Sequence, residues 1–286
     1  MSASLDAQAE STQRRRYLLL LTAPVLVLLV LFVYPVMGLL TYADRQGSAL
    51  SNMAIVLTEP LYLTVFWLTI KTAIYTTILC VAFGYPLAYV AINLSPKLQS
   101  IVVALVILPF FVSLIVRTYA WMVLLGRKGL VNSGLQALSL GEESTQLLYT
   151  QTGALIGMTY ALLPFVVLTC YSVMNSIDQR YMQAAYSLGA SPMQVFLRVF
   201  LPLSMPGVLG GSILVFIMSL GFFITPRLMG GPSDLMVAML IQHEVEMTLN
   251  WPLAAALSLF LLLVTIVGFI AYARLVKLES MFEGSR

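Results

Sequence analysis

The stretch QAAYSLGASPMQVFLRVFLP, residues 183–202, separates two long apolar runs with small and polar residues. Asp178, just before it, can cap a short helix, and Gly189 suits the left-handed residue that ends one. Ser191 and Pro192 can then begin a second helix, as N-cap and first-turn proline. A simple turn needs only a few residues. The stretch therefore predicts a structured excursion of two short helices at an angle.

The composition around this excursion is that of an integral membrane protein. The chain has 286 residues, of which 60% are hydrophobic and 9% are charged, whereas a soluble domain carries about 25% charged residues. A helix needs about 20 apolar residues to cross a bilayer. The uncharged runs predict an all-α membrane protein with six transmembrane helices, at 17–42, 62–93, 99–125, 151–175, 204–228 and 251–276.

The first of these helices follows three arginines, as the apolar core of a signal peptide would. Such cores are usually about 7–15 residues long, and this uncharged run is much longer, so we expect a helix of the mature protein. Cys80 and Cys170 both fall inside apolar runs. We expect them to be packing residues and not a disulfide.

The distribution of basic residues favours cytoplasmic N and C termini. With the N terminus inside, nine basic residues fall on the cytoplasmic side and four outside, while Lys71 and Arg117 lie within spans. The small net charge of +3 indicates membrane topology and not nucleic-acid binding. The predicted organisation is a cytoplasmic tail (1–16), a six-helix domain (17–277) with the excursion at 178–203 in the cytoplasm, a second tail (278–286), and outer loops at 43–61, 126–150 and 229–250.

The excursion offers a surface for contact. Pro202 and Pro206 are expected to bend the chain back toward the membrane. Ala184, Ala185 and Gly189 are small enough for close approach of another backbone, and further apolar contacts are expected from Tyr181, Met182, Leu188, Met193 and Phe196. Two interpretations stay open from the residues alone: a knob that fits a groove on a soluble partner, or an amphipathic helix lying on lipid.

Two charged residues fall inside the predicted spans. Lys71 and Arg117 are both expected in the outer half of the membrane, where they would line a pathway or gate, or reach toward outer headgroups. The second interpretation is preferred for Lys71, and both stay open for Arg117. All twelve acids lie in predicted loops or tails. The absence of intramembrane carboxylates argues against a proton- or sodium-coupled carrier.

Aromatic residues are the other candidates for a pathway. Tyr119, Trp121, Phe222 and Phe223 could offer ring faces to a cation, but packing and interfacial anchoring are the preferred interpretation of these residues. The stretch from Gly221 to Pro226 is expected to break the fifth helix near its outer end, as a gate or as a plain terminus.

No catalytic constellation is evident. His243, Glu244 and Glu246 are expected to belong to a solvated outer loop, since a single histidine makes a poor metal site. The sequence contains neither HExxH nor a GxxxxGK[ST] phosphate loop. We therefore predict a chain that is not an enzyme and holds no cofactor or metal of its own.

The excursion resembles the EAA loop of bacterial ABC importer permeases. That pattern is Glu-Ala-Ala, three residues, Gly, nine residues, Ile, any residue, Leu-Pro. Ala184, Ala185, Gly189, Leu201 and Pro202 match it, with Val199 for Ile and Gln183 for Glu. Gln183 keeps hydrogen-bonding capacity and loses the charge. Further segments are similar to spermidine/putrescine-type permeases, namely 59–62, 84–89, 116–121, 126–132, 228–231 and 251–256.

The resemblance implies a type I ABC importer permease of the bacterial inner membrane. It implies a cytoplasmic coupling helix that contacts an ATPase through Gln183, Ala184, Ala185, Gly189, Ser191 and Pro202. The implied partners are a second homologous permease, two ATPase subunits that bind ATP and Mg, a periplasmic binding protein and membrane lipid. The implied solute is small and polar, spermidine or putrescine first. Similar permeases carry 4-aminobutyrate, opines or aminoalkylphosphonates.

Two other classes remain as alternatives. One is a secondary transporter or channel that acts without an ATPase, and the other is a membrane scaffold that transports nothing. Transport by the chain alone in liposomes would favour the first. ATP-stimulated uptake that is lost when the loop is disrupted would exclude the second.

Overall fold

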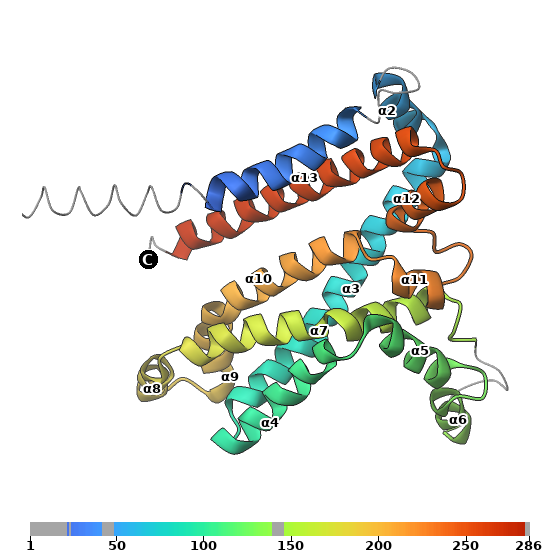
Figure 1. Cartoon of the computed structure of the whole chain (residues 1–286). Coiled ribbons are helices and arrows are strands. Elements are labelled where there is room, and N and C mark those ends of the chain that lie inside the picture. Colours follow the sequence, from blue (N-terminus) through green and yellow to red (C-terminus); the bar gives the residue numbers. More distant parts are fainter. Residues whose placement is uncertain (1–21, 23, 42–48, 139–145, 284–286) are drawn as a thin grey trace, which may run out of the picture.

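A computed structural model describes residues 22, 24–41, 49–138 and 146–283, and this part of the chain consists of helices and their connections (Figure 1). Within these residues, five helices are long and apolar enough to cross a membrane, and a bent pair of helices makes a sixth when it is counted as one span. The prediction of six spans is confirmed with that pair counted as one. The five long helices are Pro24–Thr41, Pro60–Ile92 (α3), Gln151–Ser176 (α7), Pro192–Leu220 and Trp251–Ile270, the last being part of α13 (Trp251–Glu283).

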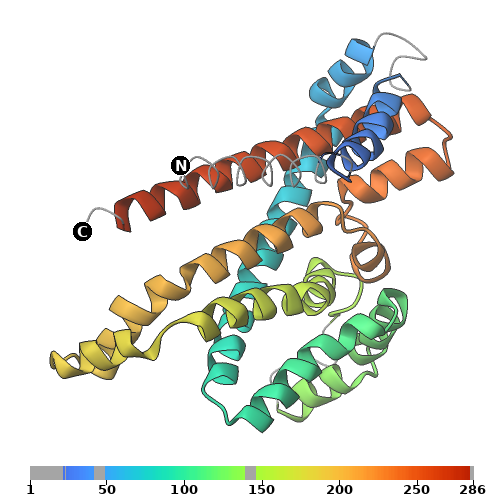
Figure 2. The same cartoon turned by 60° about the vertical axis from the view of Figure 1, so that its left-hand side comes forward.

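The centre of the bundle is made by α3, α7 and α10 (Leu201–Leu220), which lie against one another (Figures 1 and 2). Glycines allow the helices to approach closely. A Cβ atom on Gly211 would lie 2.4 Å from Thr169 Oγ1 and 3.0 Å from Val166 Cα. A Cβ on Gly84 would lie 3.0 Å from Val166 Cγ1. Cys80 and Cys170 are buried free thiols in this core, as predicted.

A second cluster joins α2 (Ala49–Thr58), α3, α12 (Val237–Glu246) and α13. Phe66 of α3 meets Phe260 of α13 edge to face at 4.6 Å. The buried Thr69 hydroxyl accepts a 2.9 Å hydrogen bond from the Val237 backbone N–H, which attaches the start of α12 to α3. α12 is thus fastened to the bundle by both apolar and polar contacts.

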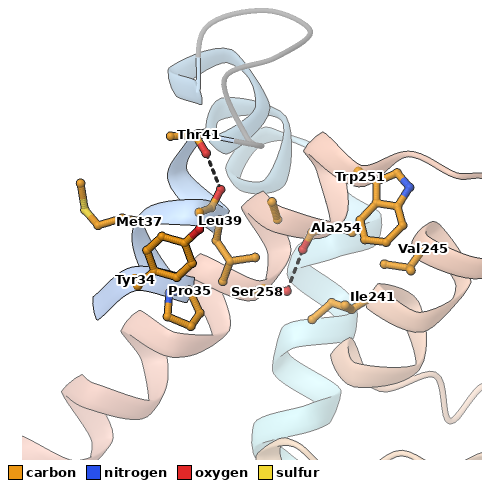
Figure 3. Close-up of a pocket in the computed structure, with 12 residues that line it drawn as sticks. Tyr34, Pro35, Met37, Leu39, Thr41, Ile241, Val245, Trp251, Ala254 and Ser258 are labelled. Carbon is orange, nitrogen blue, oxygen red and sulfur yellow. Dashed lines mark hydrogen bonds between the residues drawn. The ribbon is translucent and has the colours of Figure 1, made fainter. Parts of the chain in front are cut away.

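The helix Pro24–Thr41 lies along α13, and a cavity of about 590 Å³ opens between it, α12 and α13 (Figure 3). Among the described residues, no charged side chain lines this cavity. Two of its hydroxyls, on Thr41 and Ser258, donate to carbonyls of their own helices (Figure 3). The cavity therefore offers space to an apolar chain and few groups that would hold a polar solute.

The predicted single helix at 99–125 is wrong. The chain forms α4 (Pro96–Ile107), a 3₁₀ turn η1 (Leu108–Phe111) and α5 (Leu114–Leu125), with a bend of 103° between the two halves. Pro109 has no N–H to continue the α-helical ladder, so the helix tightens to 3₁₀ and stops at the extended residue Val112. Arg117, Tyr119 and Trp121 consequently lie beyond this bend and not on a straight span.

The other connections also hold more helix than predicted. The connections predicted as outer loops contain α2, α6 (Leu130–Ala137) and α12, and α13 continues beyond the predicted end at 276 to Glu283. Glu244 is buried, so assigning it to a solvated loop was wrong, whereas His243 and Glu246 are exposed. The predicted tail 1–16 lies outside the described residues.

Candidate functional site

The excursion begins with α8 (Gln179–Ser187), whose two ends are both closed by hydrogen bonds. The Asp178 carboxylate accepts from the Arg180 backbone N–H at 2.9 Å, as an N-cap does. At the other end Gly189 has φ +85°, its N–H bonds to the Tyr186 carbonyl, and the Ala190 N–H bonds to the Ala185 carbonyl. This pair of bonds is the Schellman motif. The predicted cap residues Asp178 and Gly189 are therefore confirmed.

A second helix starts at once with α9 (Pro192–Val195). The Ser191 hydroxyl accepts from the Gln194 N–H, and the Gln194 side chain accepts from the Ser191 N–H at 2.9 Å, which completes a capping box. Pro192 occupies the first turn, as predicted. With caps on both sides of Gly189, the excursion has a defined angle between its two helices.

The expected bend at Pro202 and Pro206 is wrong. A π-helical segment, η2 (Phe196–Phe200), joins α9 to α10, and the chain is helical without interruption from Pro192 to Leu220. The Leu201 N–H bonds to the Phe196 carbonyl, five residues back. Pro202 follows this π-helical segment as the second residue of α10. The second short helix is therefore the first part of the fifth span.

One side of the excursion is anchored to the bundle. Tyr89 of α3 packs edge to face against Phe196 at 5.3 Å and Phe200 at 5.1 Å. Val195 and Phe200 are buried, and Met182 packs against the central core. The expectation that Met182 and Phe196 face outward is thus wrong, because both help to hold the excursion on the helix ends.

A cavity of about 390 Å³ separates α8 from the ends of α3 and α7, and Gln183 contributes to its wall. Asn93, Asn175, Gln179 and Tyr186 also line it. Gln183 therefore borders this polar space between α8 and the rest of the bundle. Ser191 caps α9 as described above, and Pro202 lies at the start of α10.

The other side of the excursion is exposed within the described part of the chain. Leu188 is 89% exposed, Met193 65% and Tyr181 59%. Ala184 is exposed and Ala185 is half-buried. An apolar and small-residue surface of this kind is suited to a protein partner.

The candidate pathway residues differ in their surroundings. Trp121 packs edge to face against Tyr160 of α7 at 5.4 Å, and Phe222 packs against the central core. Tyr119 is 53% exposed, and Phe223 is half-buried at the break that precedes α11 (Ile224–Met229). The predicted break of the fifth span after Gly221 is confirmed. The interactions found for Trp121 and Phe222 are packing interactions.

A polar contact that the sequence analysis missed joins two broken spans. Thr118 of α5 and Thr225 of α11 share a buried hydrogen bond of 3.2 Å. Thr225 also fits over Gly157 of α7, where a Cβ would lie 2.5 Å from its methyl group. In the sequence, the features that point toward this contact are Thr118 in an amphipathic run and Thr225 directly before Pro226. They indicate polarity and not which residues meet.

The two intramembrane cations differ in their surroundings. Lys71 Nζ lies 5.6 Å from the ring centroid of Tyr75, one helical turn further along α3. Arg117 is half-buried, and its Nε and Nη1 atoms are out of reach of solvent and have no hydrogen-bond partner among the described residues. Lys71 thus has an aromatic ring near its charge, whereas Arg117 Nε and Nη1 have no acceptor among the described residues.

Comparisons with known proteins agree with this architecture. Residues 81–279 match the family described as binding-protein-dependent transport system inner membrane component. The spermidine/putrescine transport system permease protein PotB of Haemophilus influenzae is 36% identical over 220 residues, which cover 77% of each chain. PotB of Escherichia coli is 33% identical over 222 residues, covering 78% of this chain and 81% of the relative.

Solved structures extend the likeness to three dimensions. The crystal structure of a bacterial alginate ABC transporter matches with a TM-score of 0.68 at 18% identity, over 92% of this chain and 94% of that one. The MetNI methionine ABC transporter matches with a TM-score of 0.60 at 18% identity, over 78% and 99%. At identities this low, the structural likeness establishes the fold alone. It confirms the predicted type I importer permease architecture. The chain is a multi-pass membrane protein that belongs to the family of binding-protein-dependent transport system inner membrane components.

Proposed function

We propose that this chain forms half of the translocation pathway of an ATP-driven importer in a bacterial inner membrane. The observation that carries the proposal is the doubly capped excursion from Asp178 to Val195, which is anchored on one side and uncovered on the other. A non-catalytic membrane chain needs an external energy source, and this surface supplies a place to receive it. The distribution of basic residues supports a cytoplasmic position for this surface and for both termini.

The proposed partner at this surface is an ATPase subunit, of which the complex would hold two copies with ATP and Mg. Leu188 and Met193 would enter an apolar groove of the ATPase, while Ala184 allows its backbone to approach. A second homologous permease would complete the pathway, and a periplasmic binding protein would deliver the solute. The family description, which ties these membrane components to binding proteins, supports the last partner.

We propose a polyamine, spermidine or putrescine, as the solute. The support comes from the PotB relatives, whose names specify these compounds. Acidic groups that would attract a polyamine are absent from the predicted spans of this chain. They would have to come from the outer loops or from the second permease.

Cross-linking tests the ATPase contact. Leu188→Cys in the full complex should form a disulfide or maleimide cross-link to the ATPase, and its yield should change when ATP is added. Leu214→Cys, on the exposed side of mid-α10, is the matched control and should give no such cross-link. Cys80 and Cys170 are buried and should not contribute. An absent or ATP-insensitive cross-link at Leu188 would count against the proposal.

Reconstitution tests the transport activity and the solute. Proteoliposomes with the complete complex should take up labelled spermidine or putrescine only when ATP is present on the cytoplasmic side. Uptake by the chain without the ATPase would favour a secondary transporter or channel. Saturable ATP-driven uptake of 4-aminobutyrate in place of polyamine would retain the importer and replace the solute.

A further inference from the structure

The turn between α12 and α13, residues 247–250, holds a leucine in a backbone conformation that leucine rarely adopts. Leu249 has φ +54°, and the only other non-glycine residue with positive φ among the residues that the structure describes is Tyr149. Glycine adopts this left-handed conformation freely, whereas a residue with a Cβ atom does so at a cost. Such strain persists only where the surrounding structure enforces it, and it gathers at functional sites.

Packing within the chain accounts for Tyr149 but not for Leu249. A Cβ atom on Gly231 would lie 2.8 Å from the Tyr149 carbonyl oxygen, so the backbone at Tyr149 is pressed against the segment that follows α11. The Leu249 side chain, in contrast, is 67% exposed and belongs to none of the apolar clusters of the described chain. The described contacts therefore give no reason for a leucine at this position.

The backbone of the α12–α13 turn is fixed by polar contacts. The Asn250 N–H donates to the Glu244 carbonyl at 2.8 Å, and the Thr248 hydroxyl lies 2.6 Å from the buried Glu244 carboxylate. The Asn250 side chain accepts from the Leu253 N–H at 3.3 Å, as an N-cap of α13 does. None of these bonds uses the Leu249 side chain. The turn thus presents this side chain outward on a backbone that has little freedom to move.

The surface around Leu249 has an apolar centre and a polar border. Met247 is 65% exposed. Next to it on α12, the Glu246 carboxylate accepts from Gln242 at 3.0 Å, and Gln242 accepts from Arg227 at 2.9 Å. Charged groups are costly in hydrocarbon, so this network favours a position in water. An apolar centre with a polar border is the usual anatomy of a protein–protein interface.

The place of the turn in the fold indicates its partner. The turn and the excursion lie at opposite ends of the bundle (Figures 1 and 2). Under the proposed function this end is periplasmic, and the family description ties such membrane components to a binding protein. Lipid accepts apolar area in any backbone conformation. A protein partner gains from a preorganised contact, because less freedom is lost on binding.

We propose that Leu249 and Met247 form the apolar contact through which the periplasmic binding protein docks on this chain, with Gln242 and Glu246 at its edge. This inference rests on the proposed function, which supplies the binding protein. The strained turn holds the Leu249 side chain ready to enter an apolar depression of that protein. Docking then requires little rearrangement of this chain.

Replacement of Leu249 by glycine separates docking from folding. Glycine removes the side chain and relieves the left-handed strain, so Leu249→Gly should leave the melting temperature of the complex no lower than that of the wild type. The purified binding protein of the same transport system should bind this variant roughly 5–30-fold more weakly, measured at equilibrium on the transporter in lipid nanodiscs. Leu249→Asn should behave similarly, and Leu249→Met should stay within threefold of the wild type.

The matched control is an exposed leucine elsewhere. Leu138 follows α6, which lies apart from α12 in both views (Figures 1 and 2). Leu138→Asn should bind the binding protein within twofold of the wild type. An equal loss in Leu138→Asn and Leu249→Asn would mean that the loss is not specific to the turn, and would overturn the inference.

A fluorescent label reports what covers the turn. Leu249→Cys can be labelled with bimane in the assembled transporter, because Cys80 and Cys170 are buried. The emission should shift to shorter wavelength when the binding protein is added to the nanodiscs. A shift on transfer from detergent to lipid alone would assign the turn to the membrane interface. A thiol that cannot be labelled would assign it to the second permease. Either result would overturn the inference.

The outcomes separate this inference from the proposed function. If the wild-type transporter does not bind the binding protein, the proposed partner and the inference both fail. If the wild type binds it and Leu249→Gly and Leu249→Asn bind it equally well, only the inference fails. A melting temperature that falls together with binding in Leu249→Gly would mean that the leucine serves the folding of its own chain, and would overturn the docking role.

Discussion

Gly189 allows the coupling proposal to be tested through the backbone alone. Its φ of +85° lies in the left-handed region, and a Cβ atom there would meet nothing within 4 Å. The Cβ atom of a replacement side chain therefore adds no steric clash with a neighbour. Its effect comes only from the backbone conformation that a β-branched residue rarely adopts.

The expected cost follows from that conformation. Left-handed backbone costs a non-glycine residue about 1–2 kcal/mol, which corresponds to a factor of roughly 5–30 in a conformational equilibrium. The Schellman bonds of Ala190 and Gly189 depend on this conformation, so the substitution should loosen the angle between α8 and α9. We expect Gly189→Val to lower ATP-driven uptake by a similar factor of roughly 5–30.

The assay is initial-rate uptake into proteoliposomes, with the ATPase subunits quantified in the same vesicles. Gly210→Ala is the matched control, because its Cβ also meets nothing within 4 Å and its place in the interior of α10 favours Ala. Gly189→Asn should retain most of the activity, since Asn tolerates this conformation better than Val. Uptake by Gly189→Val within twofold of the wild type, at equal ATPase content, would refute the reasoning.

Three further predictions concern packing and capping. Gly211→Ala should lower the thermal stability of the purified complex, by about 1–3 kcal/mol, because its Cβ would meet Thr169 and the Val166 backbone; an unchanged melting temperature would contradict this helix approach. Ser191→Ala removes a capping box and should lower the stability of the second helix by about 0.5–2 kcal/mol, which would be measured as faster proteolysis within the excursion. Ser187→Ala, exposed and outside that capping box, is the control. Cys80 and Cys170 should resist maleimide in the folded complex and react after denaturation; labelling of either thiol before denaturation would show that the core opens.

Local chemistry predicted the excursion well. A cap needs only a few neighbouring residues, so Asp178, Gly189 and Ser191 could be assigned from the sequence, and the structure places all three as expected. The long uncharged runs likewise predicted the spans, because hydropathy over about 20 residues is a local property. These features required no knowledge of which helices meet.

Features that depend on tertiary contacts were predicted poorly. Pro109 stands inside an uncharged run that is long enough to span, and hydropathy does not register the ladder bond it removes. At Pro202 the error was the opposite one: a bend was predicted, but the π-helical turn before this residue keeps the helix continuous. The burial of Glu244 and the Thr118–Thr225 bond depend on how distant segments pack. Their residue types indicated polarity but not these positions.

The uninterrupted helix from Pro192 to Leu220 gives the excursion a mechanical consequence. Its 29 residues form a rod of about 43 Å at 1.5 Å per residue. A tilt of about 5° about its cytoplasmic end would carry the opposite end sideways by about 4 Å. That end adjoins Gly221 and the short helix α11, whose Thr225 is fastened to Thr118. A small stroke at the ATPase surface would thus be amplified at the outer junction of two broken spans, with the rod acting as a lever arm.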